Sequence, residues 1–99
     1  MSDLKTIRKM ASDCSGGIVT VKKLEESGGS KTVKHAKAVG VYVARKSGCE
    51  YGDIAKTFGY ANEKSVSRVF TKVSKDILYD STLQRDVNAV AEKLGIDLD

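Results

Sequence analysis

The sequence contains no proline, two cysteines and a single histidine. Because it also lacks the sustained strict alternation of apolar and polar residues that marks a half-buried strand, its pattern favours helices over strands. It has no apolar run long enough to cross a bilayer, and its polar start lacks the apolar region of a signal peptide, so we expect a cytoplasmic protein. Cys14 and Cys49 are too few for a disulfide framework and too far apart for paired metal ligands, and we interpret them as buried thiols.

The residue types that catalysis needs are equally scarce. His35 stands among lysines, with no carboxylate to tune it, and no base completes a nucleophilic set around Cys49 and Asp53. One histidine and two distant cysteines make an incomplete zinc site. No Gly-x-x-x-x-Gly-Lys-Ser/Thr loop is present to cradle a phosphate. We therefore expect a protein that is not an enzyme and that has no cofactor or metal.

Charge is distributed unevenly along the chain. Its 99 residues, 40% of them hydrophobic, are enough for one domain over residues 1–99 with one modest core. Residues 22–75 carry twelve Lys and Arg against five Asp and Glu, a balance of +7, whereas residues 76–99 carry two against six, a balance of −4. A basic middle suits one face of the protein to a polyanion, while the rest can stay solvated.

Helical spacing of apolar residues predicts an all-α, compact bundle of five to six helices. The first runs from a Ser2 cap to Cys14 and stops at Gly16-Gly17, and the second is capped by Thr20 and stops at residues 27–30. The third covers residues 31–47 and the fourth residues 50–59. The fifth starts at an Asn62 cap and runs to about Tyr79, and the last starts with the capping box Ser81-x-x-Gln84 and ends at Gly95.

The third segment leaves two alternatives. Residues 38–44 are apolar on nearly every side, which is typical of a helix enclosed by others. Val39, Val41 and Val43 also alternate, so a strand is possible. We favour a helix because the segment is long and rich in alanine, lysine and arginine.

The fourth and fifth segments have the spacing of a helix-turn-helix. A small residue, Ala55, allows close packing between the two helices, and Gly59 follows four residues later where the chain must reverse. Val66 and Val69 then close the second helix onto the first. The opposite face of that second helix is polar and basic, with Lys64, Arg68, Thr71, Lys72 and Lys75. This geometry would present residues 62–65 to base edges in the major groove, with Arg68 and Lys72 on phosphates.

Residues 32–77 resemble the C-terminal DNA-binding domain of DnaA, the bacterial chromosomal replication initiator, which shares its fold type with the Trp repressor. The resemblance is carried by Ala38-Val-Gly-Val-Tyr-Val-Ala-Arg45, by Asp53-Ile-Ala-Lys-Thr-Phe-Gly59 and by Ser65-Val66. The segment 19–24 also resembles the element that precedes the basic loop of that domain. The resemblance implies a Trp-repressor-like helix-turn-helix that binds double-stranded DNA.

The chain departs from that family where the recognition helix begins. The family has an Arg-Asp-His-Thr-Thr run there, and this chain has Ala61-Asn-Glu-Lys-Ser65. Asn62 can pair with adenine, Glu63 can accept from cytosine and Lys64 can donate to guanine, so these three with Ser65 are our candidate base readers. The sequence they recognise should differ from that of the family.

The resemblance also implies contacts outside the recognition helix. Residues at the start of the third helix would hold phosphates or enter the adjacent minor groove, and Tyr51 would contact the DNA backbone. The third-helix residues are Lys31, Lys34, His35 and Lys37.

These observations predict a sequence-specific, nucleoid-associated DNA-binding protein that regulates transcription or replication. The alternative is a protein-interaction or architectural module, in which the basic helix docks an acidic partner or non-specific DNA. A seam of Leu83, Val87, Val90 and Leu94 could also pair with a second copy, although such a seam in a small domain is more often core.

Overall fold

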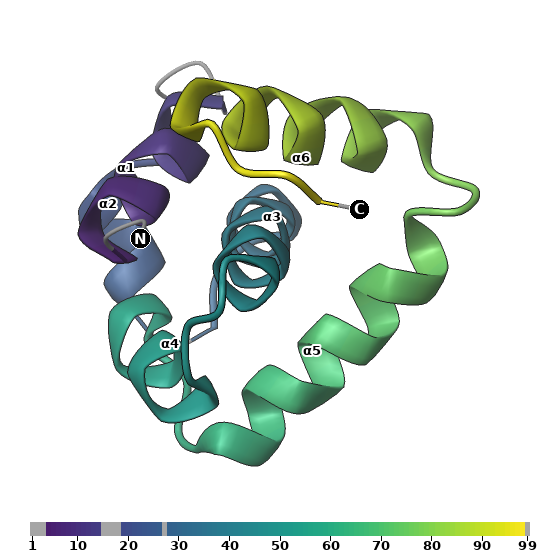
Figure 1. The fold of residues 1–99 in the computed structure, drawn as a ribbon. Helices are drawn as coiled ribbons and strands as arrows, with labels where there is room; N and C mark the ends of the chain where they lie inside the picture. Colours follow the sequence, from purple (N-terminus) through teal and green to yellow (C-terminus); the bar gives the residue numbers. More distant parts are fainter. Residues whose placement is uncertain (1–3, 15–18, 27, 99) are drawn as a thin grey trace.

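Six helices make up most of the computed structural model, which describes residues 4–14, 19–26 and 28–98 (Figure 1). They are α1 (Leu4–Cys14), α2 (Val21–Glu25), α3 (Lys31–Lys46), α4 (Tyr51–Phe58), α5 (Glu63–Asp76) and α6 (Ser81–Leu94). No strand occurs within the described residues, so the predicted all-α bundle is confirmed and the strand alternative for the third segment is wrong. The predicted Ser2 cap and Gly16-Gly17 stop lie outside the described residues. None of the described helices is long and apolar enough to cross a membrane.

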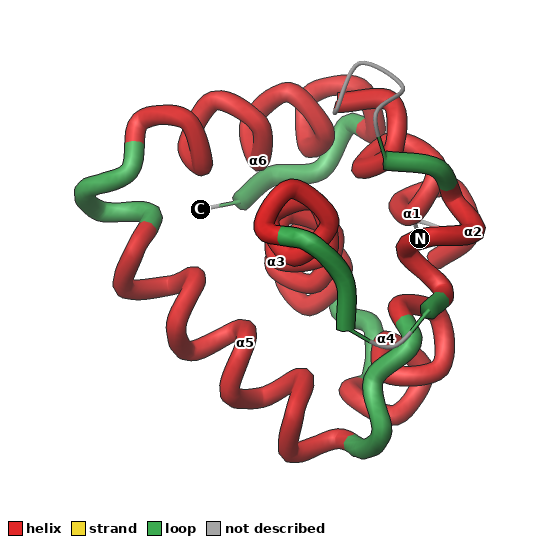
Figure 2. The backbone as a smooth tube through the Cα atoms, turned by 180° about the vertical axis from the view of Figure 1, so that it is seen from behind, coloured by secondary structure: helices red, strands yellow, loops and turns green. Residues whose placement is uncertain are grey.

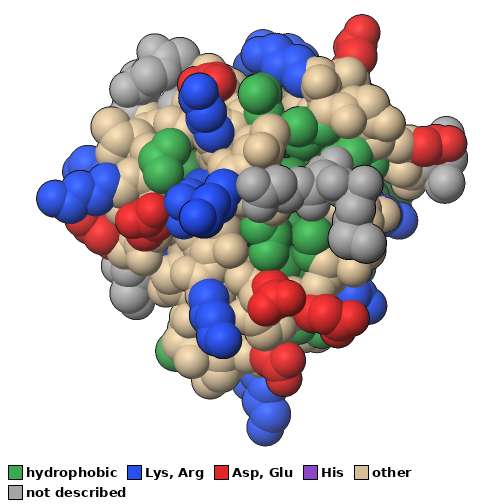
Figure 3. All heavy atoms as spheres, turned by 60° about the vertical axis from the view of Figure 1, so that its left-hand side comes forward, with side chains coloured by type: hydrophobic (Ala, Val, Ile, Leu, Met, Phe, Trp, Pro, Cys, Tyr) green, Lys and Arg blue, Asp and Glu red, His purple; other side chains and the backbone are tan. Residues whose placement is uncertain are grey.

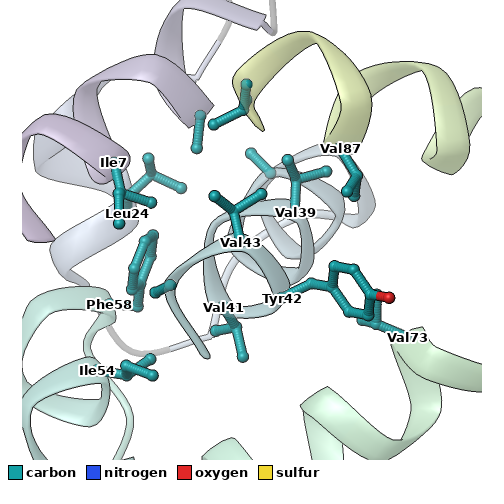
Figure 4. Packing of buried hydrophobic residues seen from close by; sticks show 14 of the residues in the cluster. Ile7, Leu24, Val39, Val41, Tyr42, Val43, Ile54, Phe58, Val73 and Val87 are labelled. Atoms are coloured by element: carbon teal, nitrogen blue, oxygen red, sulfur yellow. The ribbon is translucent and has the colours of Figure 1, made fainter. Parts of the chain in front are cut away.

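Helix α3 is the centre of the fold, with the other five helices packed around it (Figures 1 and 2). The close view in Figure 4 shows why its residues are apolar on nearly every side: Val41 lies on the side of Ile54 from α4, whereas Tyr42 points toward Val73 from α5. The Tyr42 ring also stacks on Phe70, with 5.5 Å between the ring centroids. Every residue of α3 from Val39 to Ala44 is buried, and this matches the enclosed segment that the sequence predicts.

Side-chain caps begin four of the helices. Thr20, Ser30 and Asn62 each accept a hydrogen bond from the backbone N–H three residues later, at 3.3, 3.3 and 3.0 Å. The predicted capping box at Ser81 is wrong by one residue, because Asp80 is the cap and accepts from the N–H of Leu83 at 3.0 Å. Aspartate at this place satisfies the same orphan N–H groups that a serine would.

One side-chain contact and one helix boundary also differ from expectation. The Gln84 side chain, assigned to the capping box, instead donates to the carbonyl of Ile77 in the turn before α6. Helix α5 ends at Asp76 rather than near Tyr79, and the turn that follows leaves Leu78 and Tyr79 68% and 88% exposed. Ile77 extends the apolar pattern of the helix into this turn and packs against the core, although the helix itself has already ended.

The two thiols and the α6 seam can also be placed. Cys14 and Cys49 are half-buried rather than fully buried, and burial raises the pKa of the Cys14 thiol. Leu83, Val87 and Val90 are buried in the common core. The fourth seam residue, Leu94, is half-buried and packs against that core, so this chain's own helices fill most of the seam.

Two glycines allow helices to approach more closely than a side chain would permit. A Cβ built on Gly40 in α3 would lie 2.4 Å from the ring of Phe58, so α4 packs its last aromatic directly on the α3 backbone. Gly59 follows α4 with φ of 72°, and a Cβ there would lie 2.3 Å from the carbonyl oxygen of Glu25 at the end of α2. The turn of the helix-turn-helix is thus pressed against the end of α2.

Substitution of Gly59 by alanine should therefore cost more than the left-handed conformation alone. Gly95 is a matched control, since it caps α6 with φ of 68° but a Cβ there would meet nothing within 4 Å. We expect Gly95→Ala to lower the free energy of unfolding by about 1 kcal/mol and Gly59→Ala by about 2–4 kcal/mol, as measured by urea denaturation. Equal losses in the two variants would show that the contact with Glu25 does not constrain the turn.

Candidate nucleic-acid interface

Helices α4 and α5 are joined by the short, glycine-containing turn that the sequence predicts. Helix α4 ends at Phe58 and α5 begins at Glu63, so residues 59–62 reverse the chain. The N–H groups of Gly59 and Tyr60 both donate to the carbonyl of Ala55, which closes the end of α4. Ala55 is buried, as the close approach of the two helices requires. The start of α5 is held out at one end of the molecule as a result (Figure 1).

The four candidate base readers lie together at the start of α5 but are not equally free. Asn62, Glu63 and Lys64 are exposed, and Ser65 is half-buried. The Oδ1 atom of Asn62 accepts from the backbone N–H of Ser65 at 3.0 Å and from its hydroxyl at 3.3 Å. Capping therefore occupies the Asn62 carbonyl oxygen and the Ser65 hydroxyl, and leaves the Asn62 amide nitrogen as a donor.

Glu63 leans back toward α4. A Cβ built on Gly52, in the first turn of α4, would lie 3.1 Å from the Oε1 atom of Glu63. Since Gly52 has no side chain, the carboxylate rests over its backbone. Lys64 makes no hydrogen bond or ion pair with its side chain among the described residues, which leaves it the freest of the four.

The outer face of α5 is exposed and basic, as predicted. Arg68 and Lys72 lie on it, one and two turns beyond Lys64, and both are solvent-exposed. The inner face of the helix is fixed by Val66, which is fully buried, and by the stacking of Phe70 on Tyr42. The cationic side chains are thus presented outward by a helix whose rotation is set by its apolar face.

Lys31 and Lys34 approach this face from the start of α3. Both are exposed, and together with Lys72 of α5 they line one hollow. Figure 2, viewed from behind, brings the loop that leads into α3 to the front, with α5 on one side and α6 above. The fold therefore brings lysines that are about forty residues apart in the sequence to one side of the molecule.

Lys37 is a correction to the predicted set. It is 2% exposed, its ammonium donates to the carbonyl of Glu26, and it lies 5.3 Å from the centroid of the Tyr60 ring. Burial lowers the pKa of Lys37. The group is therefore not an exposed surface anchor for a DNA phosphate. The spacing contained the signal, because position 37 follows Val33 by four residues and precedes Gly40 by three, on the buried stripe of α3.

His35 and Tyr51 are placed differently from expectation as well. The Nε2 atom of His35 lies 2.8 Å from the carboxylate of Asp86 on α6, so the histidine does have a carboxylate partner, 51 residues away in the sequence. Tyr51 is half-buried at the start of α4, and its ring lies 4.4 Å from the guanidinium of Arg45. Both side chains make contacts within the protein, His35 with α6 and Tyr51 with Arg45. These contacts leave the imidazole and the phenol ring less available for DNA.

Elsewhere the charged side chains are mixed. Figure 3 turns the left side of Figure 1 forward, and there the Lys and Arg side chains are interspersed with Asp and Glu. Among the described residues, no group of three or more His, Cys, Asp or Glu side chains is placed to hold a metal ion.

Comparison with models of known protein families finds no match for this chain, and comparison with curated protein sequences finds none either.

Tyr60 is a residue of this region that sequence reasoning missed. It follows Gly59 in the turn, and only the fold shows that its ring covers Lys37. Burial raises the pKa of Tyr60 to about 12. Because the folded state favours the neutral phenol, this group contributes stability that is fully present below its unfolded pKa near 10 and is lost as the pH rises through about 12.

We expect the free energy of unfolding to fall more steeply above pH 10 in the unmodified protein than in Tyr60→Phe. The difference should reach about 1 kcal/mol by pH 11, measured by urea denaturation at pH 9, 10 and 11. The buried lysine contributes in the opposite direction, because a lowered pKa adds stability as the pH rises toward 10.5, but phenylalanine keeps the ring over it and leaves that contribution common to both proteins. Parallel pH profiles would contradict the burial of the phenol.

Proposed function

We propose that this protein binds double-stranded DNA sequence-specifically by placing the start of α5 in the major groove, and that it regulates transcription or replication. The observation that carries the proposal is the presentation of α5: its apolar face is fixed on α3 while Lys64 at its start and the basic outer face stay free. A helix of this kind, held at the end of a tight turn, suits base reading by its first residues. The resemblance of residues 32–77 to the DnaA domain supports the same reading.

The side chains divide into two roles. Lys64, and the amide nitrogen of Asn62, would donate to base edges. Phosphate contacts fall to the exposed cations Lys31, Lys34, Arg68 and Lys72. Four such contacts correspond to a slope of log K against log salt of about −3.6. Glu63 would shape the start of the helix and would reach a cytosine only after leaving Gly52.

The decisive experiment is selection of bound duplexes from a random pool, followed by affinities on the selected and a scrambled duplex at two salt concentrations. We expect one motif to be enriched and the selected duplex to bind at least about a thousandfold more tightly than the scrambled one. Steep salt dependence without an enriched motif would instead indicate an architectural DNA-binding role. If neither an enriched motif nor a steep salt dependence is found, the hypothesis of a protein-interaction module remains.

Two lysines on α5 should then behave differently. Lys64→Ala should cost about 1–3 kcal/mol on the selected duplex and little on the scrambled one, whereas Lys72→Ala should weaken both alike and reduce the salt slope by about 1. Lys9→Ala is the matched control, because Lys9 is an exposed lysine on α1, across α3 from α5 (Figure 1). Equal loss on both duplexes for Lys64→Ala would remove that residue from base reading.

A further inference from the structure

The hollow between the start of α3 and the middle of α5 is large enough for a small molecule. Its volume is about 440 Å³, within the range of about 300–1,000 Å³ that is usual for ligand sites. Ala38, Val69, Val73 and Leu83 supply apolar surface to its lining. A site that bound only inorganic phosphate would gain no binding free energy from this apolar surface, since an inorganic anion has no apolar part to bury.

The same hollow has a surplus of positive charge. Lys31, Lys34 and Lys72 line it with side chains that take part in none of the ion pairs among the described residues. Two carboxylates, Asp76 and Asp80, also line it, and Asp80 is occupied in capping α6. With Lys37 included, four ammonium groups stand against two carboxylates.

Lys37 and Tyr60 add two polar groups at the inner side of the hollow. The Lys37 ammonium is buried, and its direct partners are the Glu26 carbonyl and the Tyr60 ring, while the charge of the Glu26 carboxylate acts on it from beyond ion-pair distance. A buried cation without an ion pair is costly, and a further anion nearby would offset part of that cost. The Tyr60 hydroxyl stays protonated well above neutral pH and has no hydrogen-bond partner among the described residues, so it can donate to an anion.

We propose that this hollow binds a small organic anion with an apolar body, such as an aryl carboxylate. The apolar body would lie on Ala38, Val69 and Val73, and the carboxylate would face Lys34 and Lys72. If α5 binds DNA as proposed above, such a ligand would occupy two of the phosphate contacts and would lower the affinity for DNA. The binding itself does not depend on that function.

A titration followed by NMR tests the proposal without DNA. The probe is 2-naphthoate, with 2-naphthylmethanol as its neutral counterpart and inorganic phosphate as an anion without an apolar body. We expect saturable shifts of the methyl signals of Ala38, Val69 and Val73 with 2-naphthoate, and binding at least about tenfold weaker for each of the other two. Absence of saturable shifts at these methyl groups would overturn the proposal. So would equal binding of the neutral alcohol, or equal competition by phosphate.

Matched variants separate the hollow from the general charge of the surface. The double variant Lys34→Gln, Lys72→Gln should weaken 2-naphthoate binding by about tenfold. The control Lys9→Gln, Lys75→Gln removes the same charge from exposed lysines outside the hollow and should change it by less than about twofold. Equal effects of the two double variants would overturn the proposal. All four positions are exposed, so the comparison does not depend on a variant that disturbs the core.

The outcomes of the DNA-binding and 2-naphthoate-binding experiments together distinguish this proposal from the proposed function. If the chain binds no DNA, saturable 2-naphthoate binding with the expected variant effects still supports the hollow. If DNA binding is sequence-specific and 2-naphthoate gives no shifts, the ligand site alone is wrong.

Discussion

The buried ammonium of Lys37 is the contact on which the placement of the candidate recognition helix depends. The Lys37 ammonium connects three segments of the chain. It belongs to α3, it donates to the carbonyl of Glu26, the residue that caps the end of α2, and it lies beneath the ring of Tyr60 in the turn before α5. A cation removed from water must keep its partners or lose several kcal/mol. The end of α2 and the turn of the helix-turn-helix are therefore held in register with α3 by the same group.

The short helix α2 gains its importance from this arrangement. Its end is also where Gly59 comes within contact of the Glu25 carbonyl and where Arg8 of α1 forms an ion pair with the Glu25 carboxylate at 3.0 Å. Arg8 reaches α4 as well, donating to the carbonyl of Thr57 at 3.2 Å. A helix of five residues is unstable alone, and here its end is fixed by the side chains of Arg8 and Lys37 and by the backbone of the turn at Gly59. In return it fixes the turn that orients α5.

Local signals in the sequence predicted the helices well, and long-range contacts explain the errors. Caps such as Thr20 and Asn62 and the left-handed Gly59 and Gly95 depend on neighbouring residues only, so they can be predicted from spacing. The capping box at Ser81 failed because Asp80 offers an equally good oxygen one residue earlier.

The candidate site shows the same division between local and distant causes. The exposed positions of Lys64, Arg68 and Lys72 follow from the helical period of α5. The partner of His35 is 51 residues away on α6, and the ring over Lys37 belongs to a turn 23 residues later, so neither could be read from local spacing. A lysine on a basic stretch suggests the surface, but position 37 falls on the stripe that α3 buries. For Lys37, the helical periodicity of apolar residues predicts burial correctly, whereas the residue type does not.

The internal contacts at the start of α5 narrow what the helix can recognise if it lies in the major groove. The side-chain carbonyl oxygen of Asn62 accepts the capping hydrogen bond from the backbone of Ser65 and a second one from the Ser65 hydroxyl. The Glu63 carboxylate lies over Gly52. The groups left free, the Asn62 amide nitrogen and the Lys64 ammonium, are both donors. Donors pair with the acceptors of guanine, with N7 of adenine or with O4 of thymine, and not with the amino group of cytosine. Because the cap already fixes Asn62, little side-chain freedom remains to be lost on binding at that position. The same hydrogen bonds that begin the helix thus set both its rigidity and the chemistry of the bases it can contact.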